Sequence, residues 1–160
     1  MKFLALTALL LSLVSFQTAL ADNFPKGPVE QMTPGALCSH PDSYRYPEKV
    51  PYCSRNVSSD LKARVIEDYD RRFGFKIGQM PRSQFKIDHY IPLCMGGANE
   101  AANLWPQHQS VYTITDPLEE ALCGKMAEGR LQQKEAVELI KEAKNHLDEV
   151  PGILAKVHAL

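Results

Sequence analysis

The sequence after residue 21 lacks any apolar run of about 20 residues, the length that a membrane-spanning helix requires. It also lacks internal repeats and low-complexity tracts, which excludes solenoid and fibrous architectures. No two of its four cysteines have the C-x-x-C spacing typical of zinc-binding modules. The 160 residues have the length of one domain preceded by a removable segment.

Residues 1–21 have the pattern of a secretory signal peptide. Lys2 supplies the positive start, and residues 3–14 are apolar except for Thr7 and Ser12. Residues 19–21, Ala-Leu-Ala, form a small-residue cleavage site. The pattern predicts an exported protein, periplasmic or secreted, whose mature chain begins at Asp22 and has no membrane span.

The cysteines are even in number, which in an exported chain favours disulfides. Four cysteines allow three pairings. We expect Cys38 to pair with Cys53 and Cys94 with Cys123, because each pair brackets one structural unit. A four-cysteine zinc site is the alternative, and the spacing disfavours it.

Charge is distributed unevenly along the chain. Residues 45–86 contain ten Lys and Arg against five Asp and Glu, whereas residues 88–160 contain six against eleven. A basic middle followed by an acidic end favours a surface that faces nucleic acid. The alternative is an ordinary solvated helix face.

Periodicity and capping residues predict three helices. The first spans residues 59–73 from a cap at Ser59 to a stop at Gly74. The second begins at Asp116, where Asp-Pro-x-Glu resembles a capping box with Glu119, and ends near Gly129. The third spans residues 132–147. Residues 22–32 are expected to form a flexible lead, and residues 151–160 a tail that frays.

Residues 87–107 read IDHYIPLCMGGANEAANLWPQ and are the most informative stretch for function. Asp88 and His89 end an alternating apolar run, a Gly-Gly turn follows, and Asn103 lies fourteen residues after His89. This pattern, D-H-x-x-P-L-x-x-G-G-x5-N-L, resembles the HNH (ββα-metal, His-Me finger) nuclease motif. In that motif a hairpin and a helix hold one divalent metal beside a general base. A looser similarity to small secreted bacterial proteins of this kind covers most of the mature chain.

The resemblance implies a role for each residue of the motif. His89 and Asn103 would be the catalytic pair, with His89 the general base and Asn103 the middle asparagine that ties the hairpin together and orients it. Asp88 would be a metal ligand. The family's further ligand, from the following helix, falls here near Tyr112, and His108 is the nearest metal-type side chain that could replace it.

Phosphodiester hydrolysis explains why these residue types are required. A neutral imidazole can take a proton from water near neutral pH, and a divalent cation neutralises charge on the scissile phosphate. Carboxylate oxygens favour Mg²⁺, with Mn²⁺ and Zn²⁺ as alternatives. Adjacent strand residues point to opposite faces, so Asp88 and His89 can share one phosphate only if the strand bends or ends there. Pro92, shortly afterwards, is consistent with such an end.

Other residues are candidates for more modest roles. Arg82, Lys86 and Arg55 could each hold a phosphate of DNA or RNA, although each could equally be an ordinary surface cation. Trp105 is expected in the core rather than stacked on a base. His89 could instead be a hydrogen-bonded structural histidine.

The sequence therefore predicts an α+β fold with a ββα-metal core, surrounding helices and two disulfides. Its segments are a signal peptide at 1–21, a loop-rich part at 22–58, the HNH-like domain at 59–150 and a tail at 151–160. The expected function is metal-dependent hydrolysis of DNA, and of RNA as a further substrate, with low sequence specificity. The alternatives are an inactive relative that binds nucleic acid or protein, and a secreted metal-dependent hydrolase of another kind.

Overall fold

The computed structural model describes residues 22–160, so the predicted signal peptide lies outside the described residues. The described chain forms four α-helices and two antiparallel two-stranded sheets, which confirms the α+β class. In chain order the elements are β1 (Ser43–Arg45), β2 (Val50–Tyr52), α1 (Ser59–Phe73), β3 (Phe85–His89), β4 (Leu104–His108), α2 (Gln109–Ala127), α3 (Gln133–Asn145) and α4 (Val150–His158).

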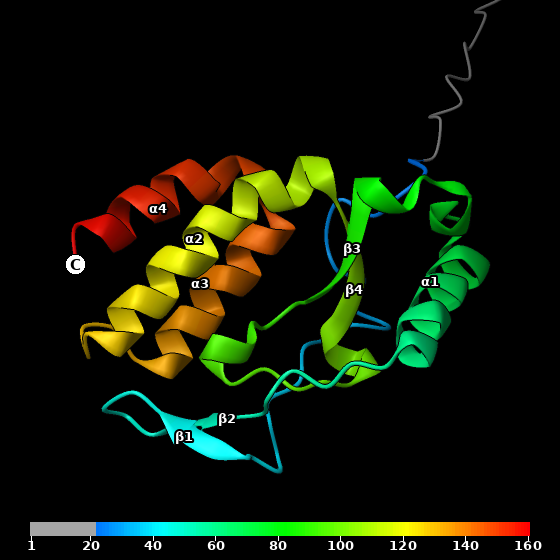
Figure 1. Cartoon of the computed structure of the whole chain (residues 1–160). Helices are drawn as coiled ribbons and strands as arrows, with labels where there is room; N and C mark the ends of the chain where they lie inside the picture. The colour runs from blue at the N-terminus through cyan, green and yellow to red at the C-terminus, as the bar shows by residue number, and fades with distance from the viewer. Residues whose placement is uncertain (1–21) are drawn as a thin grey trace, which may run out of the picture.

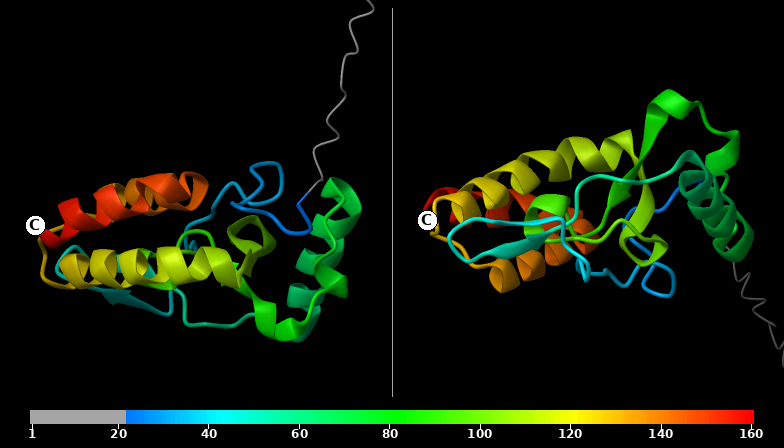
Figure 2. Two further views of the ribbon diagram at one scale, coloured as in Figure 1. Left: turned by 90° about the horizontal axis from the view of Figure 1, so that it is seen from above. Right: turned by 60° about the horizontal axis from the view of Figure 1, so that its bottom comes forward.

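The β3–β4 hairpin separates two parts of the molecule (Figures 1 and 2). On one side α1 lies against it, and on the other α2, α3 and α4 pack together. Helix α2 follows β4 without a linker, so its first residues stay beside the hairpin. Two strands are thus followed at once by a helix.

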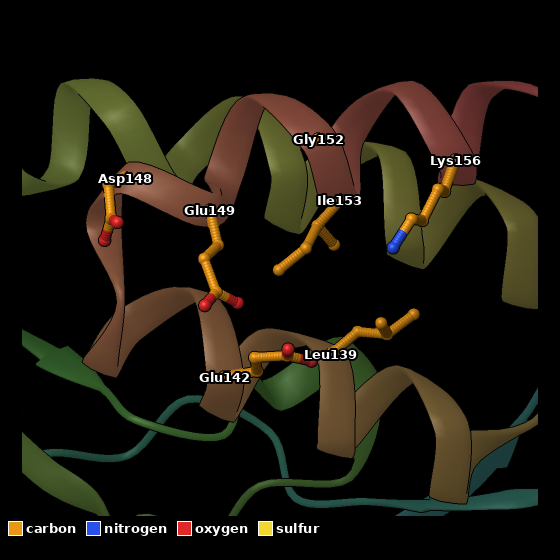
Figure 3. A pocket seen from close by; sticks show the side chains of 7 residues that line it. All are labelled: Leu139, Glu142, Asp148, Glu149, Gly152, Ile153 and Lys156. Carbon is orange, nitrogen blue, oxygen red and sulfur yellow. The ribbon is translucent and has the colours of Figure 1, made fainter.

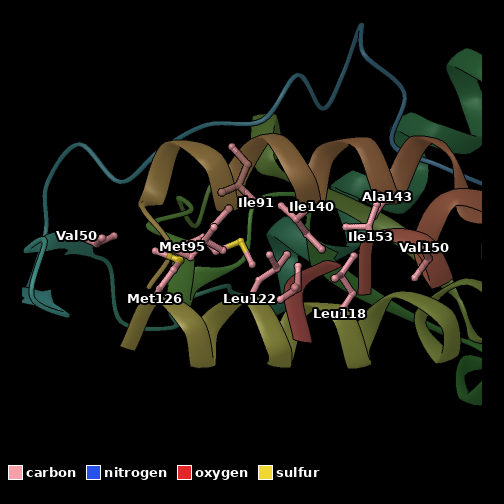
Figure 4. Close-up of a cluster of buried hydrophobic side chains, with 13 residues drawn as sticks. Val50, Ile91, Met95, Leu118, Leu122, Met126, Ile140, Ala143, Val150 and Ile153 are labelled. Atoms are coloured by element: carbon pink, nitrogen blue, oxygen red, sulfur yellow. The ribbon is translucent and has the colours of Figure 1, made fainter. Parts of the chain in front are cut away.

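Each part has its own hydrophobic core. Figure 4 shows the helical core, where α2, α3 and α4 pack on Val50 of β2 and on Ile91 and Met95 from the loop after β3. The second core joins α1 to the hairpin around Tyr69 and Trp105, both fully buried. Trp105 is therefore a core residue, as expected. Burial on both sides fixes the hairpin in place, which a site built on it requires.

Helix α1 has the bounds that the sequence predicts. Its cap is Ser58 rather than Ser59, because the Ser58 hydroxyl accepts the Leu61 backbone N–H. Gly74 ends the helix in the left-handed conformation, at φ 76°. Val65 and Tyr69, four residues apart, face the second core.

The connection between β3 and β4 is an ordered loop that packs closely on itself. A Cβ atom added at Gly97 would lie 1.8 Å from the Ile91 carbonyl oxygen and 2.8 Å from Asn103 Nδ2. Only glycine allows the backbone to approach this closely. The Gly-Gly pair thus serves close packing within the loop as well as the turn that the sequence predicts.

We expect Gly97→Ala to destabilise the protein by about 3 kcal/mol, because the added methyl group meets a backbone oxygen that cannot move aside. Gly124→Ala is the matched control, since nothing lies within 4 Å of a Cβ there. It should stabilise α2 by up to about 1 kcal/mol. Urea denaturation of the oxidised proteins measures both changes. Equal stability of the two variants would contradict this account of the loop.

Helix α2 begins seven residues earlier than predicted and passes through Pro117. The capping-box interpretation of Asp116 and Glu119 is therefore wrong. The true cap is His108, whose ring accepts the Ser110 backbone N–H. Buried Val111, Leu118 and Leu122 recur along one face, and their packing outweighs the hydrogen bond that Pro117 cannot donate. Asp116 and Glu119 consequently lie within the helix.

The two ends of the described chain are better packed than the sequence suggests. Residues 150–158 form α4 instead of fraying, and Val150, Ile153 and Val157 enter the helical core. Pro151 stands in the first turn of this helix, where its missing N–H costs nothing. Within the lead, the Val29 N–H donates to the Tyr69 hydroxyl. Packing against the domain, which local sequence does not reveal, orders both segments.

Both expected disulfides are present. Cys38 pairs with Cys53 and Cys94 with Cys123, and together they include every cysteine of the chain. The second bridge joins the loop after β3 to α2. Two disulfides fit an extracellular or periplasmic protein. Nowhere in residues 22–160 is there a helix both long and apolar enough to cross a membrane.

Candidate active site

Three carboxylates meet where β3 faces α2. Asp88 comes from the strand, and Asp116 and Glu119 come from successive turns of the helix. One ligand atom from each lies within 4.8 Å of the other two, close enough to bind one cation. Asp88 is only 7% exposed. All three donors are oxygen atoms, which hard divalent cations such as Mg²⁺ prefer.

Two lysines balance this negative charge. Lys86 Nζ donates to both Asp116 oxygens at 2.9 Å and lies 3.3 Å from Asp88 Oδ2. The contact with Asp88 is an ion pair without hydrogen-bond geometry, and Oδ2 has no hydrogen-bond partner within the described residues. Lys144, fully buried on α3, lies 3.5 Å from Glu119 and donates to the His89 carbonyl oxygen at 2.7 Å.

The lysines also set the protonation of the carboxylates. Burial raises the pKa of Asp88, but the ammonium groups of Lys144 and Lys86 outweigh this and hold it below its usual value. Burial alone would lower the pKa of Lys86, but the carboxylates of Asp88 and Asp116 together outweigh burial and raise it above its usual value. For Glu119, burial raises the pKa despite Lys144. At neutral pH Asp88 is ionised and Lys86 is charged.

The hydrogen bonds around His89 identify its free nitrogen. Asn99 Nδ2 donates to the Ser54 carbonyl oxygen, so its Oδ1 faces His89 Nε2 at 3.0 Å. An amide oxygen only accepts, so Nε2 carries the proton in the neutral ring and Nδ1 keeps a free lone pair. Nδ1 is buried and has no hydrogen-bond partner among residues 22–160. Burial lowers the pKa of His89, and the hydrogen bond with Asn99 only partly opposes this shift. Because the pKa is lowered, the ring is neutral at pH 7.

Asn103 ties the loop to the hairpin. Its Oδ1 accepts the Ile91 backbone N–H at 2.8 Å, and its Nδ2 donates to the carbonyl oxygens of Ile91 and Ala98. The side chain is completely buried. These bonds fix the backbone immediately after His89, which is the structural part of the role that the resemblance implies.

Asp88 and His89 have different neighbours. Strand β3 ends at His89, as the sequence predicts. Asp88 interacts with Lys86 and with groups on α2 and α3, whereas His89 binds Asn99 in the loop after β3. The Asp88 charge still acts on the imidazole and opposes the lowering of its pKa. The two groups are thus electrostatically coupled neighbours without a direct hydrogen bond between their side chains in the described chain.

The structure does not place His108 beside Asp88. In the hairpin His108 pairs with Phe85, and Asp88 pairs with Trp105, three positions along the strand. The His108 ring caps α2 and stacks on Phe24, with ring centroids 3.8 Å apart. The structure therefore does not support His108 as the further metal ligand. Asp116 and Glu119 are the acidic groups that lie beside Asp88.

The three expected phosphate contacts have separate environments. Arg55 is exposed, and its charge lowers the pKa of His89, so it lies near the imidazole. Arg82 donates to the Phe85 carbonyl oxygen and covers the Phe85 ring. Lys86 is held in the carboxylate cluster. Of the three, Arg55 has the charge most available for a phosphate near His89.

Sequence reasoning missed four side chains of this site: Asp116, Glu119, Lys144 and Asn99. The first two are three residues apart, a spacing that places them on one helix face and that the capping box seemed to explain. Lys144 belongs to a predicted amphipathic helix. A lysine on the apolar face of that helix was the signal that could have indicated a buried, paired charge. Asn99 stands in the motif loop, and nothing local distinguishes it from a turn residue.

A hollow of about 310 Å³ between α3 and the start of α4 is separate from this site (Figure 3). Its walls are formed by Leu139, Glu142, Asp148, Glu149, Gly152, Ile153 and Lys156. None of these residues belongs to the cluster around Asp88 or to the surroundings of His89.

Comparisons of the chain with protein-family models, with curated proteins and with solved structures found no match.

Proposed function

We propose that this protein is an exported, metal-dependent endonuclease of the HNH type that hydrolyses DNA, and RNA as a further substrate, with low sequence specificity. The observation that carries the proposal is the strand–strand–helix unit that gathers Asp88, Asp116 and Glu119 next to a neutral histidine. Neither the hairpin nor the helix alone would assemble this set.

The carboxylates suit a divalent cation. Asp88, Asp116 and Glu119 would hold Mg²⁺, with Mn²⁺ as an alternative, since an all-oxygen set is less suited to Zn²⁺. Such an ion would supply charge neutralisation at the scissile phosphate. The buried Asp88 Oδ2, which lacks a hydrogen bond from the described residues, is an oxygen with coordination capacity to spare.

The remaining chemistry belongs to the chain itself. His89 would take the proton of the attacking water at Nδ1, because Nε2–H is engaged by Asn99. Lys144 and Asn103 are positioning residues, since they bind the backbone on either side of Tyr90 through the His89 carbonyl and Ile91. Arg55 would hold a substrate phosphate near the imidazole.

A second candidate function is an inactive relative that binds nucleic acid or protein. Two observations favour it: Lys86 and Lys144 already neutralise much of the carboxylate charge, and His89 is only 2% exposed. Cleavage would require the groups over Nδ1 to move aside when substrate binds. Binding without cleavage would require no such change.

Metal removal distinguishes the two functions. With the disulfide-bonded mature chain and supercoiled plasmid, we expect nicking in Mg²⁺ or Mn²⁺ and none in excess EDTA, because Asp88 and its neighbours then lack their cation. Asp116→Asn should lose most of the activity, while Asp148→Asn, in the separate hollow of Figure 3, should keep it. Plasmid binding without nicking under every metal condition would favour the inactive relative.

A further inference from the structure

We propose that Lys86 is an internal competitor of the divalent cation, so that its ammonium group occupies the carboxylate cluster until a metal ion displaces it. This inference rests on the metal site of the proposed function and adds a residue that controls its affinity. Lys86 Nζ contacts the very carboxylates that would be ligands, at 2.9 Å from Asp116 and 3.3 Å from Asp88. It therefore occupies the space next to their oxygens.

Charge balance favours either the Lys86 ammonium group or a divalent cation in the cluster, but not both together. Three carboxylates and two ammonium groups leave the cluster with one net negative charge. A dication added to this arrangement would make the partly buried site net positive, and the ammonium group of Lys86 would repel it at close range. Without Lys86 the remaining groups carry two net negative charges, and a dication neutralises them.

Of the two lysines, Lys86 is the one free to leave. The Lys144 side chain is completely buried and its Nζ is bound to the His89 carbonyl oxygen at 2.7 Å, so its departure would disturb the backbone of the site. The Lys86 side chain, from the second residue of β3, is 36% exposed. Its Nζ also lies 4.8 Å from the centroid of the Tyr112 ring, whose face is available for a cation–π contact once the ammonium group leaves the carboxylates.

Asp88 Oδ2 supports displacement rather than a permanent ion pair. This buried oxygen has no hydrogen bond from the described residues, even though Lys86 is 3.3 Å away. The ammonium group satisfies Asp116 well and Asp88 poorly, so a lysine is an imperfect substitute for an ion that binds all the carboxylates together. After displacement the Lys86 ammonium becomes available to a phosphate oxygen.

The test measures Mn²⁺ binding without substrate. Isothermal titration of MnCl₂ into the disulfide-bonded mature protein should give an affinity about tenfold or more tighter for Lys86→Met than for the wild type, because the competing charge-assisted bonds are gone. Lys76→Met, an exposed lysine with no ion pair within residues 22–160, should bind like the wild type. Lys86→Arg, which keeps the charge, should not gain affinity.

Thermal unfolding gives an independent readout. Without metal, Lys86→Met should melt below the wild type, since Asp88 and Asp116 lose their counter-ion. Saturating Mn²⁺ should raise the melting temperature of Lys86→Met more than that of the wild type. The two melting temperatures should therefore be closer together with Mn²⁺ than without it. Lys86→Gln serves as a second neutral variant if the methionine protein does not fold, as judged by circular dichroism.

The outcomes separate the two proposals. Equal Mn²⁺ affinity for the wild type and both neutral variants would overturn the competitor role of Lys86 and leave the metal site of the proposed function intact. Absence of Mn²⁺ binding in all variants would overturn both. The double variant Lys86→Met with Asp88→Asn should lose the gain in Mn²⁺ affinity. If it binds Mn²⁺ as tightly as Lys86→Met alone, the ion lies outside the carboxylate cluster and the inference is overturned.

Discussion

Replacing His89 by alanine is expected to lower the rate of plasmid nicking on the order of 10²- to 10⁴-fold, the usual contribution of a general base. The reason is the loss of Nδ1, the unprotonated ring nitrogen that the bond from Nε2–H to Asn99 leaves free. His89→Gln is a sharper variant, because its amide can keep the bond to Asn99 but has no basic lone pair. Both should show this loss of nicking rate, with metal binding and folding close to those of the wild type.

The control is His40→Ala, since His40 is exposed and its ring bonds only with Ser39 within residues 22–160. It should nick plasmid at the wild-type rate. Full activity of His89→Gln would show that the imidazole is structural. Such a result would leave the carboxylate cluster without its proposed base.

The pH profile supplies a second signature of the same residue. Burial holds the pKa of His89 below its usual 6.5, with Asn99 and Asp88 opposing and Arg55 and Lys144 assisting the shift. The neutral ring is the reactive form, so nicking should be independent of pH just above 6.5 and should fall at lower pH with a midpoint below that value. A midpoint above 6.5 would contradict the direction of the shift. The Lys76→Met protein should show the same profile as the wild type.

Asn103→Ala is expected to lower the free energy of unfolding by about 3 kcal/mol or more, a loss at least as large as that from Gly97→Ala. It leaves three buried backbone groups without partners, namely the N–H and carbonyl of Ile91 and the carbonyl of Ala98. Each unsatisfied buried group costs about 1–3 kcal/mol. Urea denaturation followed by circular dichroism measures the loss.

Asn56→Ala is the matched control, because Asn56 is exposed and its side chain makes no hydrogen bond within residues 22–160. Its stability should stay within about 0.5 kcal/mol of the wild type. A similarly small change for Asn103→Ala would mean that water or a rearranged loop satisfies the Ile91 and Ala98 groups. The positioning role of Asn103 would then be wrong.

Local sequence was sufficient where neighbouring residues determine the structure. Helix α1 could be predicted because its cap, its four-residue apolar repeat and the glycine at its end all lie within the segment itself. The first hairpin strand could be predicted for the same kind of reason, because the alternating apolar run before Asp88 is recognisable without the rest of the chain. The disulfide pairs are the preferred ones of three pairings that the sequence allows. The motif also gave Asp88, His89 and Asn103 as neighbours in one hairpin.

Local signals failed where packing outweighed them. Asp-Pro-x-Glu is typical of a helix start, yet α2 begins at Gln109 and continues through Pro117. Burial of its apolar face stabilises the helix by more than the one hydrogen bond lost at Pro117 costs. The same competition turned the expected tail into α4. In both cases the deciding contacts come from elements distant in sequence.

The amino-acid sequence by itself determined local features of this protein: the helix at 59–73 and the Asp-His and Asn positions of the hairpin. Only the tertiary structure decided which charges meet. It brought Asp116 and Glu119 from α2 and Lys144 from α3 to Asp88 and the backbone of His89, and it put Lys86 among the carboxylates. The physical reason is range: capping, turns and periodicity act over a few residues, whereas burial and charge pairing join residues that only folding brings together.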